Sequence, residues 1–447
     1  MSERCSQNEQ LSQSRQSIQD GHLSQSEQFS QESADTGKML HVDINSYFAT
    51  LLQQETPALR GKPMVVVKDV GRSCVIAASK EAKKLGIQTG SLVGDAKLRC
   101  LQAGKQLQIA PAQFDVYWSA TRDLYALLRS FSPDTELFSL DEAFIPHASI
   151  QRLYPDPEVL GRELQVRIKQ TLGEWVTCNV GIGPNRFLAK MQSETAPKGS
   201  VTRVNWQTAP ALLAQTPFDS VCGIGHRLEK RLARLGVRVP YQINFFEPEL
   251  LESMFGPFWS RELQKMAVGQ EPHFLTRSAT PLPHMKSVGR SITGYELCWS
   301  AELVRATLYN LVSEVMYKVR RMQLGGRRVA VSLRGDGQRW GAHRTLQTEI
   351  RHTAAMFSVV QSLLEQRQQP FPVIKIAVSL SLLKPWQATQ QPLLPQWHRQ
   401  ERIAQAIDSM ADKHGLFTIT SGRLLRKKII MPEVTGFLGD KTFQFGA

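Results

Sequence analysis

The sequence predicts a multidomain protein of the α+β class, in which strands and helices form several separate cores. At 447 residues the chain is longer than one hydrophobic core normally organises, and its 42% hydrophobic residues are enough to build more than one. Short β-rich runs alternate with helical patterns along the first half of the chain. Residues 287–385 then show a β-α-β-β-α-β order, which is typical of a compact sheet-and-helix domain.

The first 36 residues are rich in Ser, Gln and Glu, and the dipeptide Ser-Gln recurs in them. With few aliphatic side chains to bury, we expect residues 1–36 to be a disordered tail, either a solvated leader or a docking segment. Ordered structure should begin at "KMLHVDINSYFATLL", where a strand ends at Asp43 and a helix follows. A lone aspartate at such a junction is most often a helix cap.

The next segments contain two lysines and an acidic pair. "SCVIAASKEAKKLGIQTG" predicts a strand and a short helix closed by Gly86, on which Lys80 and Lys83 share one face. "ELFSLDEAFIPHAS" sets Asp141 and Glu142 side by side in an apolar strand. Such a pair either lies in water at a strand end or needs a cation or an arginine as its partner. A regular strand would point the two side chains to opposite faces, so their joint use requires a strand end or a turn.

Two glycine-containing stretches follow. "TCNVGIGPNRFLAKMQSETAPKGSV" predicts a strand, a glycine turn, an amphipathic helix and a basic loop that contains Lys198. In "VCGIGHRLEKRLARLGV", Gly223 and Gly225 shape a tight turn into a basic helix. The backbone N–H groups of such a turn can bind an anion such as a phosphate, and an ordinary helix–helix turn is the alternative.

The composition favours a nucleic-acid partner. The net charge is +14, which suits a polyanion. No apolar run approaches the length of a membrane-spanning helix, and "MSERCSQNEQ" lacks the features of a secretion signal. The six cysteines are scattered without a CxxC spacing, which indicates reduced thiols in the cytosol and no zinc site.

Four blocks now carry a family resemblance: "HVDINSYFA", "FSLDEAFI", "VGIGPNRFLAKMQSE" and "GIGHRLEKRLARLGV". In this order and at these separations they resemble the signature blocks of Y-family translesion DNA polymerases of the DinB/UmuC class. The similarity runs from about residue 38 to about residue 385. It implies a right-hand polymerase with a palm (37–50 and 112–204), small fingers (51–111), a helical thumb with a helix-hairpin-helix (205–275), a linker (276–286), a β-α-β-β-α-β little finger (287–385) and a C-terminal tail (386–447).

The resemblance gives the carboxylates a role. It implies that Asp43, Asp141 and Glu142, with the backbone carbonyl of Ile44, bind two Mg²⁺ ions. Nucleotidyl transfer needs one metal to activate the primer 3'-hydroxyl and another to neutralise the triphosphate and its pyrophosphate leaving group. Hard oxygen ligands suit magnesium in both places. Asn45 replaces a second aspartate that many members carry, a loss that the metal site should tolerate.

The resemblance also implies nucleotide contacts. Phe48 occupies the steric-gate position, where its ring would exclude the 2'-hydroxyl of a ribonucleotide. Its alternative is a core aromatic, as for its neighbour Tyr47, which is also a candidate nucleotide contact. Lys80 and Lys83 replace the usual Tyr and Arg of the fingers helix, and lysine lacks the planar fork of arginine. Lys198 stands in for a family lysine that normally precedes a proline.

For DNA, the resemblance implies phosphate contacts from the turn at Gly223 and Gly225 and from strand-borne arginines of the little finger: Arg290, Arg327, Arg328 and Arg334. Any one of these arginines can instead be a plain surface charge. The segment from Gln391 to Pro395 resembles in part a peptide that docks in the sliding clamp, but it lacks the final aromatic. The last residues, with Phe443 and Phe445, are another candidate docking peptide, and an ordinary linker remains open.

The expected protein is an active DNA-directed DNA polymerase of low fidelity that copies damaged template with primer-template DNA and dNTPs as its partners. We expect a cytoplasmic monomer without membrane contact, associated with the nucleoid if bacterial. The alternative is a catalytically inactive relative that binds DNA as an accessory subunit of a mutagenesis complex. Such relatives lose the acidic ligands, whereas this chain keeps all of them. A helix-hairpin-helix lyase or glycosylase would leave the palm blocks unexplained.

Overall fold

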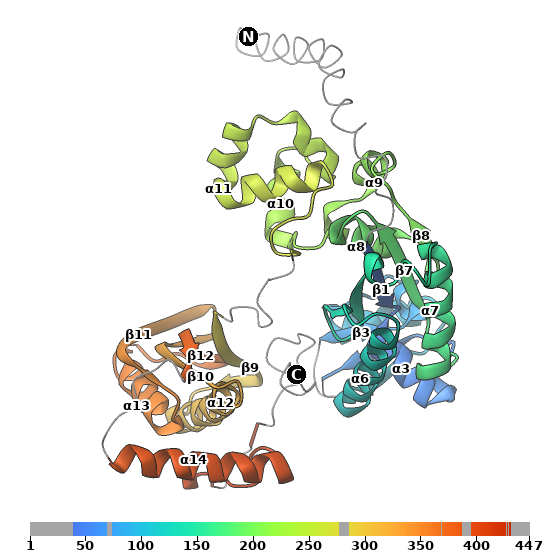
Figure 1. Ribbon diagram of the computed structural model, residues 1–447. Helices are drawn as coiled ribbons and strands as arrows, with labels where there is room; N and C mark the ends of the chain where they lie inside the picture. Colours follow the sequence, from blue (N-terminus) through green and yellow to red (C-terminus); the bar gives the residue numbers. More distant parts are fainter. Residues whose placement is uncertain are drawn as a thin grey trace. The chain divides into compact units, whose positions relative to one another are not determined.

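The computed structural model describes residues 39–68, 74–276, 286–367, 369–386, 395–425, 427 and 429–430. The chain divides into two compact units, Met1–Arg277 and Ser278–Ala447 (Figure 1). We call them the N-terminal and the C-terminal unit. The predicted tail (1–36), residues 277–285 of the predicted linker, residues 391–394, Phe443 and Phe445 lie outside the described residues.

A five-stranded sheet forms the centre of the N-terminal unit, with the strand order β5-β6-β1-β7-β8. Its strands are β1 (Met39–Ile44), β5 (Glu136–Leu137), β6 (Glu142–Pro146), β7 (Cys178–Gly183) and β8 (Val201–Arg203). The predicted strand "MLHVDI" is β1, which pairs antiparallel with both β6 and β7. Its side chains are buried on both faces, as the central position in a covered sheet requires.

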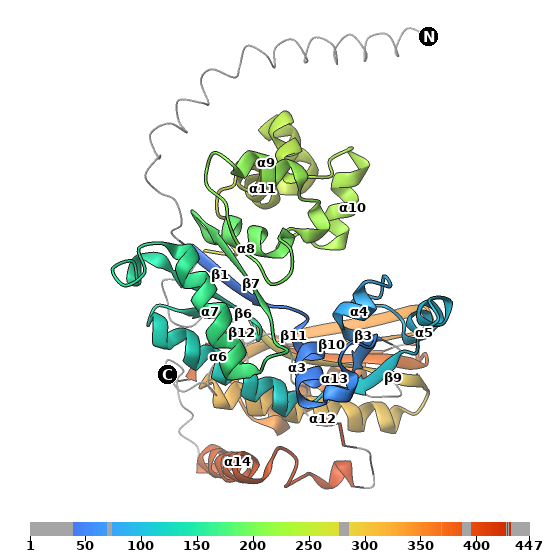
Figure 2. The same ribbon diagram turned by 90° about the vertical axis from the view of Figure 1, so that its right-hand side faces the viewer.

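Helices cover both faces of this sheet (Figure 2): α6 (Phe114–Phe131), α7 (Pro157–Leu172) and α8 (Arg186–Thr195). A Cβ at Gly181 of β7 would lie 2.1 Å from the carbonyl oxygen of Ala189 in α8. Gly161 of α7 lies against Val180, the preceding residue of β7. Because successive strand residues point to opposite faces, α7 and α8 pack on opposite sides of the sheet. At the glycines of β7, α8 contacts the strand backbone directly.

The N-terminal unit contains a second sheet, with three strands in the order β3-β2-β4. It contains β2 (Met64–Val67), β3 (Val75–Ala78) and β4 (Gln108–Pro111), and the helices that accompany it are α3 (Tyr47–Glu55), a 3₁₀ turn (Pro57–Leu59), α4 (Lys80–Lys83) and α5 (Val93–Gln102). The predicted short lysine helix is α4. Ser79 caps its first turn by accepting a hydrogen bond from Ala82 N, and Gly86, with φ +75°, follows its end.

The last part of the N-terminal unit is helical. It contains α9 (Ala209–Gln215), α10 (His226–Arg234), α11 (Pro248–Ala267) and 3₁₀ turns at Phe218–Ser220 and Pro240–Phe245. Their apolar side chains form one core with Phe187 and Leu188 of α8, so this helical part is anchored on the helix that covers the five-stranded sheet. α11 is kinked where Gly256, with φ +80°, precedes Pro257.

The C-terminal unit contains a four-stranded antiparallel sheet of order β11-β10-β12-β9. Its elements are β9 (Ser287–Cys298), α12 (Ala301–Arg321), β10 (Leu324–Gly335), β11 (Gln338–Ile350), α13 (Thr353–Leu364) and β12 (Val373–Pro385). This is the predicted β-α-β-β-α-β order. Val329, Val331 and Leu333 of β10 pack into the core with the helices. The residues between them point to the opposite, open face of the sheet.

An additional helix, α14 (Pro395–His414), belongs to the same unit, and a 3₁₀ turn (Gly422–Leu424) follows it. α14 docks on α12 through ion pairs such as the one between Asp408 and Arg320, whereas Ile403, Ile407 and Met410 stay exposed. A surface helix normally buries its apolar stripe, whereas α14 packs its acidic side chains against the unit and leaves these apolar side chains exposed. Part of the segment expected to be a tail is therefore a docked helix.

No helix in the described part of the chain combines the length and the apolar character needed to cross a lipid bilayer.

Candidate functional site

The two acidic stretches of the sequence meet at one end of the five-stranded sheet. In the register of β1 and β6, Asp43 pairs with Glu142, and directly paired residues point to the same face. Asp141 precedes β6, and its carbonyl oxygen accepts a hydrogen bond from Ile44 N at 3.0 Å. The acidic pair thus lies at a strand end, as the alternation of side chains required. We call Asp43, Asp141 and Glu142 the carboxylate cluster.

Burial and mutual repulsion act on two members of the cluster. Burial first, and then the charges of Asp141 and Glu142, raise the pKa of Asp43 to about 7. The positive charge of Lys198 acts in the other direction. Burial also raises the pKa of Asp141, although Ser139 Oγ donates a hydrogen bond to its Oδ1 at 2.5 Å. A nearby cation would favour the ionised form of both aspartates.

The negative charge of Glu142, in contrast, is balanced by a cation of the chain itself. Its Oε2 accepts hydrogen bonds from His41 Nε2 at 2.9 Å and from Lys190 Nζ. Burial alone would raise the pKa of Glu142, but the hydrogen bond from His41 and the charge of Lys190 outweigh it and lower the pKa to about 2. Burial lowers the pKa of His41 to about 4, so its imidazole is neutral at pH 7 and donates through Nε2. A hydrogen bond of 2.7 Å between Nδ1 and Ser193 Oγ orients the ring.

The donor set fits a hard divalent cation. Among the residues that the structure describes, no three His, Cys, Asp or Glu side chains are arranged to hold a metal ion by themselves. Magnesium, however, usually takes one or two protein carboxylates and completes its shell with water and substrate phosphates. Asp43 and Asp141 provide two such carboxylates, and the carbonyl of Ile44 follows directly. Glu142 fits only in part, because its Oε2 is bound by Lys190 and His41.

Tyr47 and Phe48 begin α3, close to Asp43, but they lie in different environments. Tyr47 is buried, and its hydroxyl donates to the carbonyl oxygen of Tyr117 at 2.7 Å and lies 2.8 Å from Thr121 Oγ1. Phe48 is only half-buried, and its ring centroid lies 4.5 Å from that of Tyr117. The side chain of Tyr47 is therefore committed to the core, so a nucleotide contact by this residue can come only from its backbone.

Of the three lysines singled out in the sequence, Lys83 and Lys198 interact electrostatically with the carboxylate cluster, whereas Lys80 binds a neighbouring threonine. Lys80 Nζ donates to Thr177 Oγ1, which lies just before β7, at 3.0 Å. Burial first, and then the charge of Lys198, lower the pKa of Lys83, while Asp43 and Asp141 raise it. Burial first, and then nearby lysines that include Lys198, lower the pKa of Lys80. The charge of Lys198 also acts to lower the pKa of Asp43. Lys83 of α4 and Lys198 of the loop after α8 therefore both lie close enough to the carboxylate cluster to interact with its charges.

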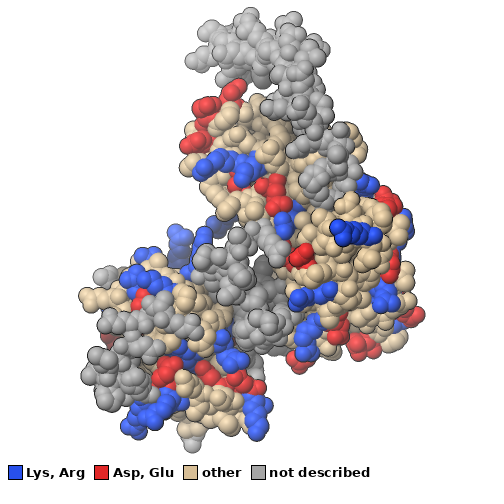
Figure 3. All heavy atoms as spheres, in the orientation of Figure 1, with Lys and Arg blue, Asp and Glu red and all other residues tan. Residues whose placement is uncertain are grey.

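The glycine turn before α10 has the predicted backbone. Gly223 has φ +87°, and a Cβ there would lie 2.2 Å from the ring of Phe274. Gly225 is the N-cap of α10, whose sequence "HRLEKRLAR" is rich in cations. Figure 3 shows Lys and Arg side chains on the surfaces of both units, mixed with Asp and Glu.

Two of the four arginines predicted to contact DNA are held by carboxylates of the C-terminal unit. Arg290 is only 6% exposed, and its Nε donates to Glu314 Oε2 of α12 at 2.7 Å. Successive side chains of β9 point to alternate faces of the sheet, and Arg290 points to the face that the helices cover. A charge buried there needs a partner such as Glu314. Arg290 is therefore left out of the proposed DNA-binding surface. Arg327 is partly exposed, and its Nε lies 3.7 Å from Glu349 Oε1.

Arg328 and Arg334 do lie exposed on the open face of β10. Arg334 pairs in register with Arg339 of β11 and with Lys375 of β12, so three cations stand side by side across the sheet. We call Lys375, Arg334 and Arg339 the cation row. Directly opposed like charges repel each other, and the row therefore favours an anionic ligand.

Known families match both units of the chain. The model of the impB/mucB/samB family matches residues 42–194, and the model of its C-terminal domain matches residues 285–393. The DNA polymerase IV of Moorella thermoacetica is 31% identical over 390 residues, which span 84% of this chain and 93% of that protein. The chain belongs to the Y family of DNA polymerases, in its DinB/UmuC class. The resemblance predicted from the four blocks is thereby confirmed.

Further comparisons agree with this membership. The DNA polymerase IV of Pelotomaculum thermopropionicum is 29% identical over 385 residues, 85% of this chain and 94% of that protein. The solved structure of a Y-family DNA polymerase chimera of Dbh and Dpo4 is similar with a TM-score of 0.63 at 22% identity, over 77% of this chain and 98% of that one. It confirms the multidomain α+β fold. The docked helix α14 of this Y-family polymerase begins beyond residue 393, where the C-terminal family match ends.

Several groups around the site of this Y-family polymerase were not found from the sequence. His41 and Lys190 hold Glu142, Tyr117 packs against Phe48, and Thr177 binds Lys80. They stand in ordinary-looking strand and helix patterns, and their roles depend on which elements become neighbours. Only Lys190 left a signal, because a lysine within "RFLAKM" falls on the apolar face of its helix.

Proposed function

We propose that this Y-family polymerase carries out template-directed, translesion DNA synthesis, adding dNTPs to a primer 3'-hydroxyl opposite damaged template bases. The observation that carries the proposal is the carboxylate cluster, in which two strands bring Asp43 and Asp141 together without neutralising them. The DNA polymerase IV relatives support the same activity.

Two Mg²⁺ ions, when bound, would activate the primer 3'-hydroxyl and neutralise the triphosphate and the leaving pyrophosphate. Asp43 and Asp141 would hold them through their carboxylates, with help from the carbonyl of Ile44. Glu142 would contribute the carboxylate oxygen that Lys190 and His41 do not bind. Those two partners keep Glu142 ionised and fix its orientation before any ligand arrives.

The triphosphate would be bound by Lys80, Lys83 and Lys198. Each ammonium group acts as a compact point charge, so phosphate oxygens would be attracted without the two-point geometry that an arginine imposes. Phe48 would lie against the sugar and exclude the 2'-hydroxyl of a ribonucleotide. Its partial exposure and its contact with the buried ring of Tyr117 support this role, because a gate needs a rigid support.

Primer-template DNA would be held by its phosphates. The five-stranded part would be the palm, the three-stranded part the fingers, α9 to α11 the thumb, and the C-terminal unit the little finger. The turn at Gly223 and Gly225 and the exposed side chains of Arg328 and the cation row would contact the backbone independently of base sequence. Loose enclosure of the new base pair would admit damaged bases and lower fidelity.

The protein would act as a monomer in the bacterial cytoplasm, associated with the nucleoid. Clamp binding through Gln391 to Pro395 or through the C-terminal residues stays a prediction. Pro395 itself begins α14.

Primer extension on undamaged and lesion-containing templates tests the proposal. The wild type should extend in Mg²⁺ and stop in EDTA, while Asp141→Ala/Glu142→Ala should still bind primer-template but not extend it. Asp336→Asn, an exposed position in the β10–β11 turn, is the control for an acidic substitution and should extend normally. A wild type that binds DNA but does not extend in Mg²⁺ would instead support the accessory-subunit function.

A further inference from the structure

Asn179 lies fully buried on β7 and uses all of its hydrogen-bonding groups. Its Nδ2 donates to the carbonyl oxygens of Ser193 at 2.7 Å and Ala196 at 3.3 Å. Its Oδ1 accepts from Gly199 N at 2.7 Å and from Asn45 Nδ2 at 3.2 Å. One side chain on the sheet thereby connects the end of α8, the turn that follows it and the end of β1.

The turn that Asn179 holds carries Lys198. Ser200 N donates to the carbonyl oxygen of Pro197 at 3.2 Å, and Gly199 has φ +83°, as the third residue of a type II turn requires. Lys198 occupies the second position of this turn. Its backbone is fixed on both sides by Asn179, so its ammonium group extends from a defined point near the carboxylate cluster.

Thr177 contacts a second lysine, Lys80, in this case through the lysine side chain. Its Oγ1 accepts hydrogen bonds from Lys80 Nζ at 3.0 Å and from Asn45 Nδ2 at 3.3 Å. Lys80 comes from α4, so this bond joins the three-stranded part to the five-stranded part. Thr177 lies just before β7 and Asn179 lies within it, and both side chains accept a hydrogen bond from Asn45 Nδ2. Together with Asn45, which contacts both, they form what we call the polar platform.

A site built on lysines needs such support. A lysine has a flexible four-carbon stem, so holding its charge at one place costs side-chain entropy, and it lacks the pre-organised fork of arginine. The polar platform contacts the side chain of Lys80 directly, and it holds the turn of Lys198 through the backbone of Ala196 and Gly199. A polar core of purely structural purpose would influence stability and leave nucleotide affinity unchanged.

We propose that Thr177 and Asn179 are positioning residues for the incoming nucleotide, which act through Lys80 and Lys198 on the affinity for its triphosphate. The inference rests on the proposed function, because that function assigns the two lysines to the triphosphate.

Thr177→Val removes the hydroxyl with little change of shape and gives the sharper test. The KM for dNTP should rise about three- to tenfold, as expected for one lost hydrogen bond to a charged group. The kcat and the Kd for primer-template should stay within about twofold. Thr177→Ser keeps the hydroxyl, is the matched control and should restore KM to near the wild-type value.

The coupling between Thr177 and Lys80 decides whether the hydroxyl acts through the lysine. In a Lys80→Ala background, Thr177→Val should add less than about a twofold further increase in KM. An unchanged KM in the single variant would overturn the proposal for Thr177. So would a full, independent effect in the Lys80→Ala background.

Asn179 is tested in the same way with Lys198→Ala. Because Asn179 is buried and fully bonded, Asn179→Ala also destabilises the fold, so Asn179→Ser is made beside it and both are melted first. In the better folded variant KM should rise about three- to tenfold, and the effect should largely disappear in the Lys198→Ala background. Independent, multiplying effects would show that Asn179 supports only the fold.

Equilibrium titration of dNTP onto the complex with a primer ending in a 3'-dideoxynucleotide separates this inference from the proposed function. A wild type that binds dNTP but never extends a normal primer would end the proposed function. The Thr177→Val titration would still support or overturn the platform by whether affinity falls. Normal extension by the wild type, with wild-type dNTP affinity in all the platform variants, would overturn the platform alone.

Discussion

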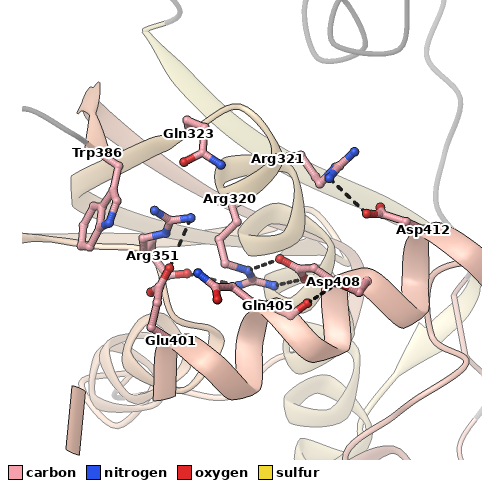
Figure 4. A pocket seen from close by; sticks show the side chains of 10 residues that line it. Arg320, Arg321, Gln323, Arg351, Trp386, Glu401, Gln405, Asp408 and Asp412 are labelled. Carbon is pink, nitrogen blue, oxygen red and sulfur yellow. Dashed lines mark hydrogen bonds and ion pairs between the residues drawn. The ribbon is translucent and has the colours of Figure 1, made fainter. Parts of the chain in front are cut away.

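The carboxylate cluster of the N-terminal unit and the ion pairs beneath α14 both place acidic side chains in partly buried positions, but only in the second set is every carboxylate paired with a cation. Beneath α14, Asp408 accepts two hydrogen bonds from Arg320, at 2.7 and 2.8 Å (Figure 4). The other two acidic residues of the helix face Arg321 and Arg351. Each carboxylate of this group has a cation from the body of the unit.

In the carboxylate cluster only Glu142 has such partners. Within the described residues, no Lys, Arg or His lies at ion-pair distance from Asp43 or Asp141, and the pKa of both is raised by burial. Balanced charges fix one element on another, whereas a surplus of one sign favours an ion or ligand from outside. The contrast therefore separates a structural charge network from a ligand site, and substitutions can break or sharpen it.

The largest effect is expected for Asp43→Asn. Primer extension should fall by on the order of 10³-fold, because a proposed metal ligand is lost. The metal-free variant should nevertheless melt at the same temperature as the wild type or higher, because repulsion inside the cluster is relieved. Added Mg²⁺ should stabilise the wild type more than the variant.

Asp336→Asn serves as its control and should leave activity and melting unchanged. If metal-free Asp43→Asn melted several degrees below the wild type, Asp43 would have a structural partner, as the aspartates of α14 do, and the contrast would be lost.

Phe48→Ala is expected to have the next largest effect. Ribonucleotide incorporation relative to deoxynucleotide incorporation should rise about 10- to 100-fold, since the proposed gate against the 2'-hydroxyl is removed. Single-nucleotide kinetics with matched dNTP and NTP measure this ratio. Tyr47→Phe is the control, because it removes a hydroxyl bound within the core and should reduce stability without changing sugar selection. Unchanged sugar selection in Phe48→Ala would remove the gate assignment.

Asp408→Asn probes the neutralised group. The free energy of unfolding of the C-terminal unit should fall by about 1–2 kcal/mol, because charge-assisted bonds from Arg320 are weakened. Primer extension below the melting temperature should change by less than about twofold. Denaturant unfolding and extension assays on the same preparation give both values. A large loss of extension with normal stability would mean that α14 takes part in function.

Arg334→Gln should have the smallest effect. One cation of the row disappears, so DNA affinity should fall about two- to fivefold and the dependence on salt should weaken by roughly one ion. Stability should not fall, because repulsion within the row is relieved. Arg290→Gln is the matched control: it should destabilise the unit, since Glu314 loses its partner, and leave the salt slope unchanged. Equal salt slopes for Arg334→Gln and the wild type would exclude the cation row from the DNA contact.

The sequence predicted the fold and the carboxylate cluster because both rest on short continuous blocks. "HVDINSYFA" and "FSLDEAFI" each contain a strand and its acidic end, and neighbouring strands then bring the acidic ends together. The β-α-β-β-α-β order likewise follows from local periodicity, which depends on residues near in the chain.

What the sequence did not predict depends on register and on faces. The cation row exists only because Arg334 is opposite Arg339 and Lys375, and one residue of slip would disperse it. The sequence also did not separate Arg290 from the other three arginines, because its ion pair with Glu314 depends on which face of β9 the side chain is on. The docking of α14 was not predicted either, because apolar periodicity favours burying the stripe that this helix leaves exposed.

Gly181 and Gly183 bring α8 onto β7 until main chain meets main chain. A Cβ at Gly183 would lie 2.7 Å from Ala189 N, so neither position has room for a side chain. Lys190 is the next residue of α8, so this close main-chain contact helps to hold the lysine against the sheet that carries Glu142. A side chain at either glycine would push α8 away from the sheet and so draw this lysine away from its glutamate.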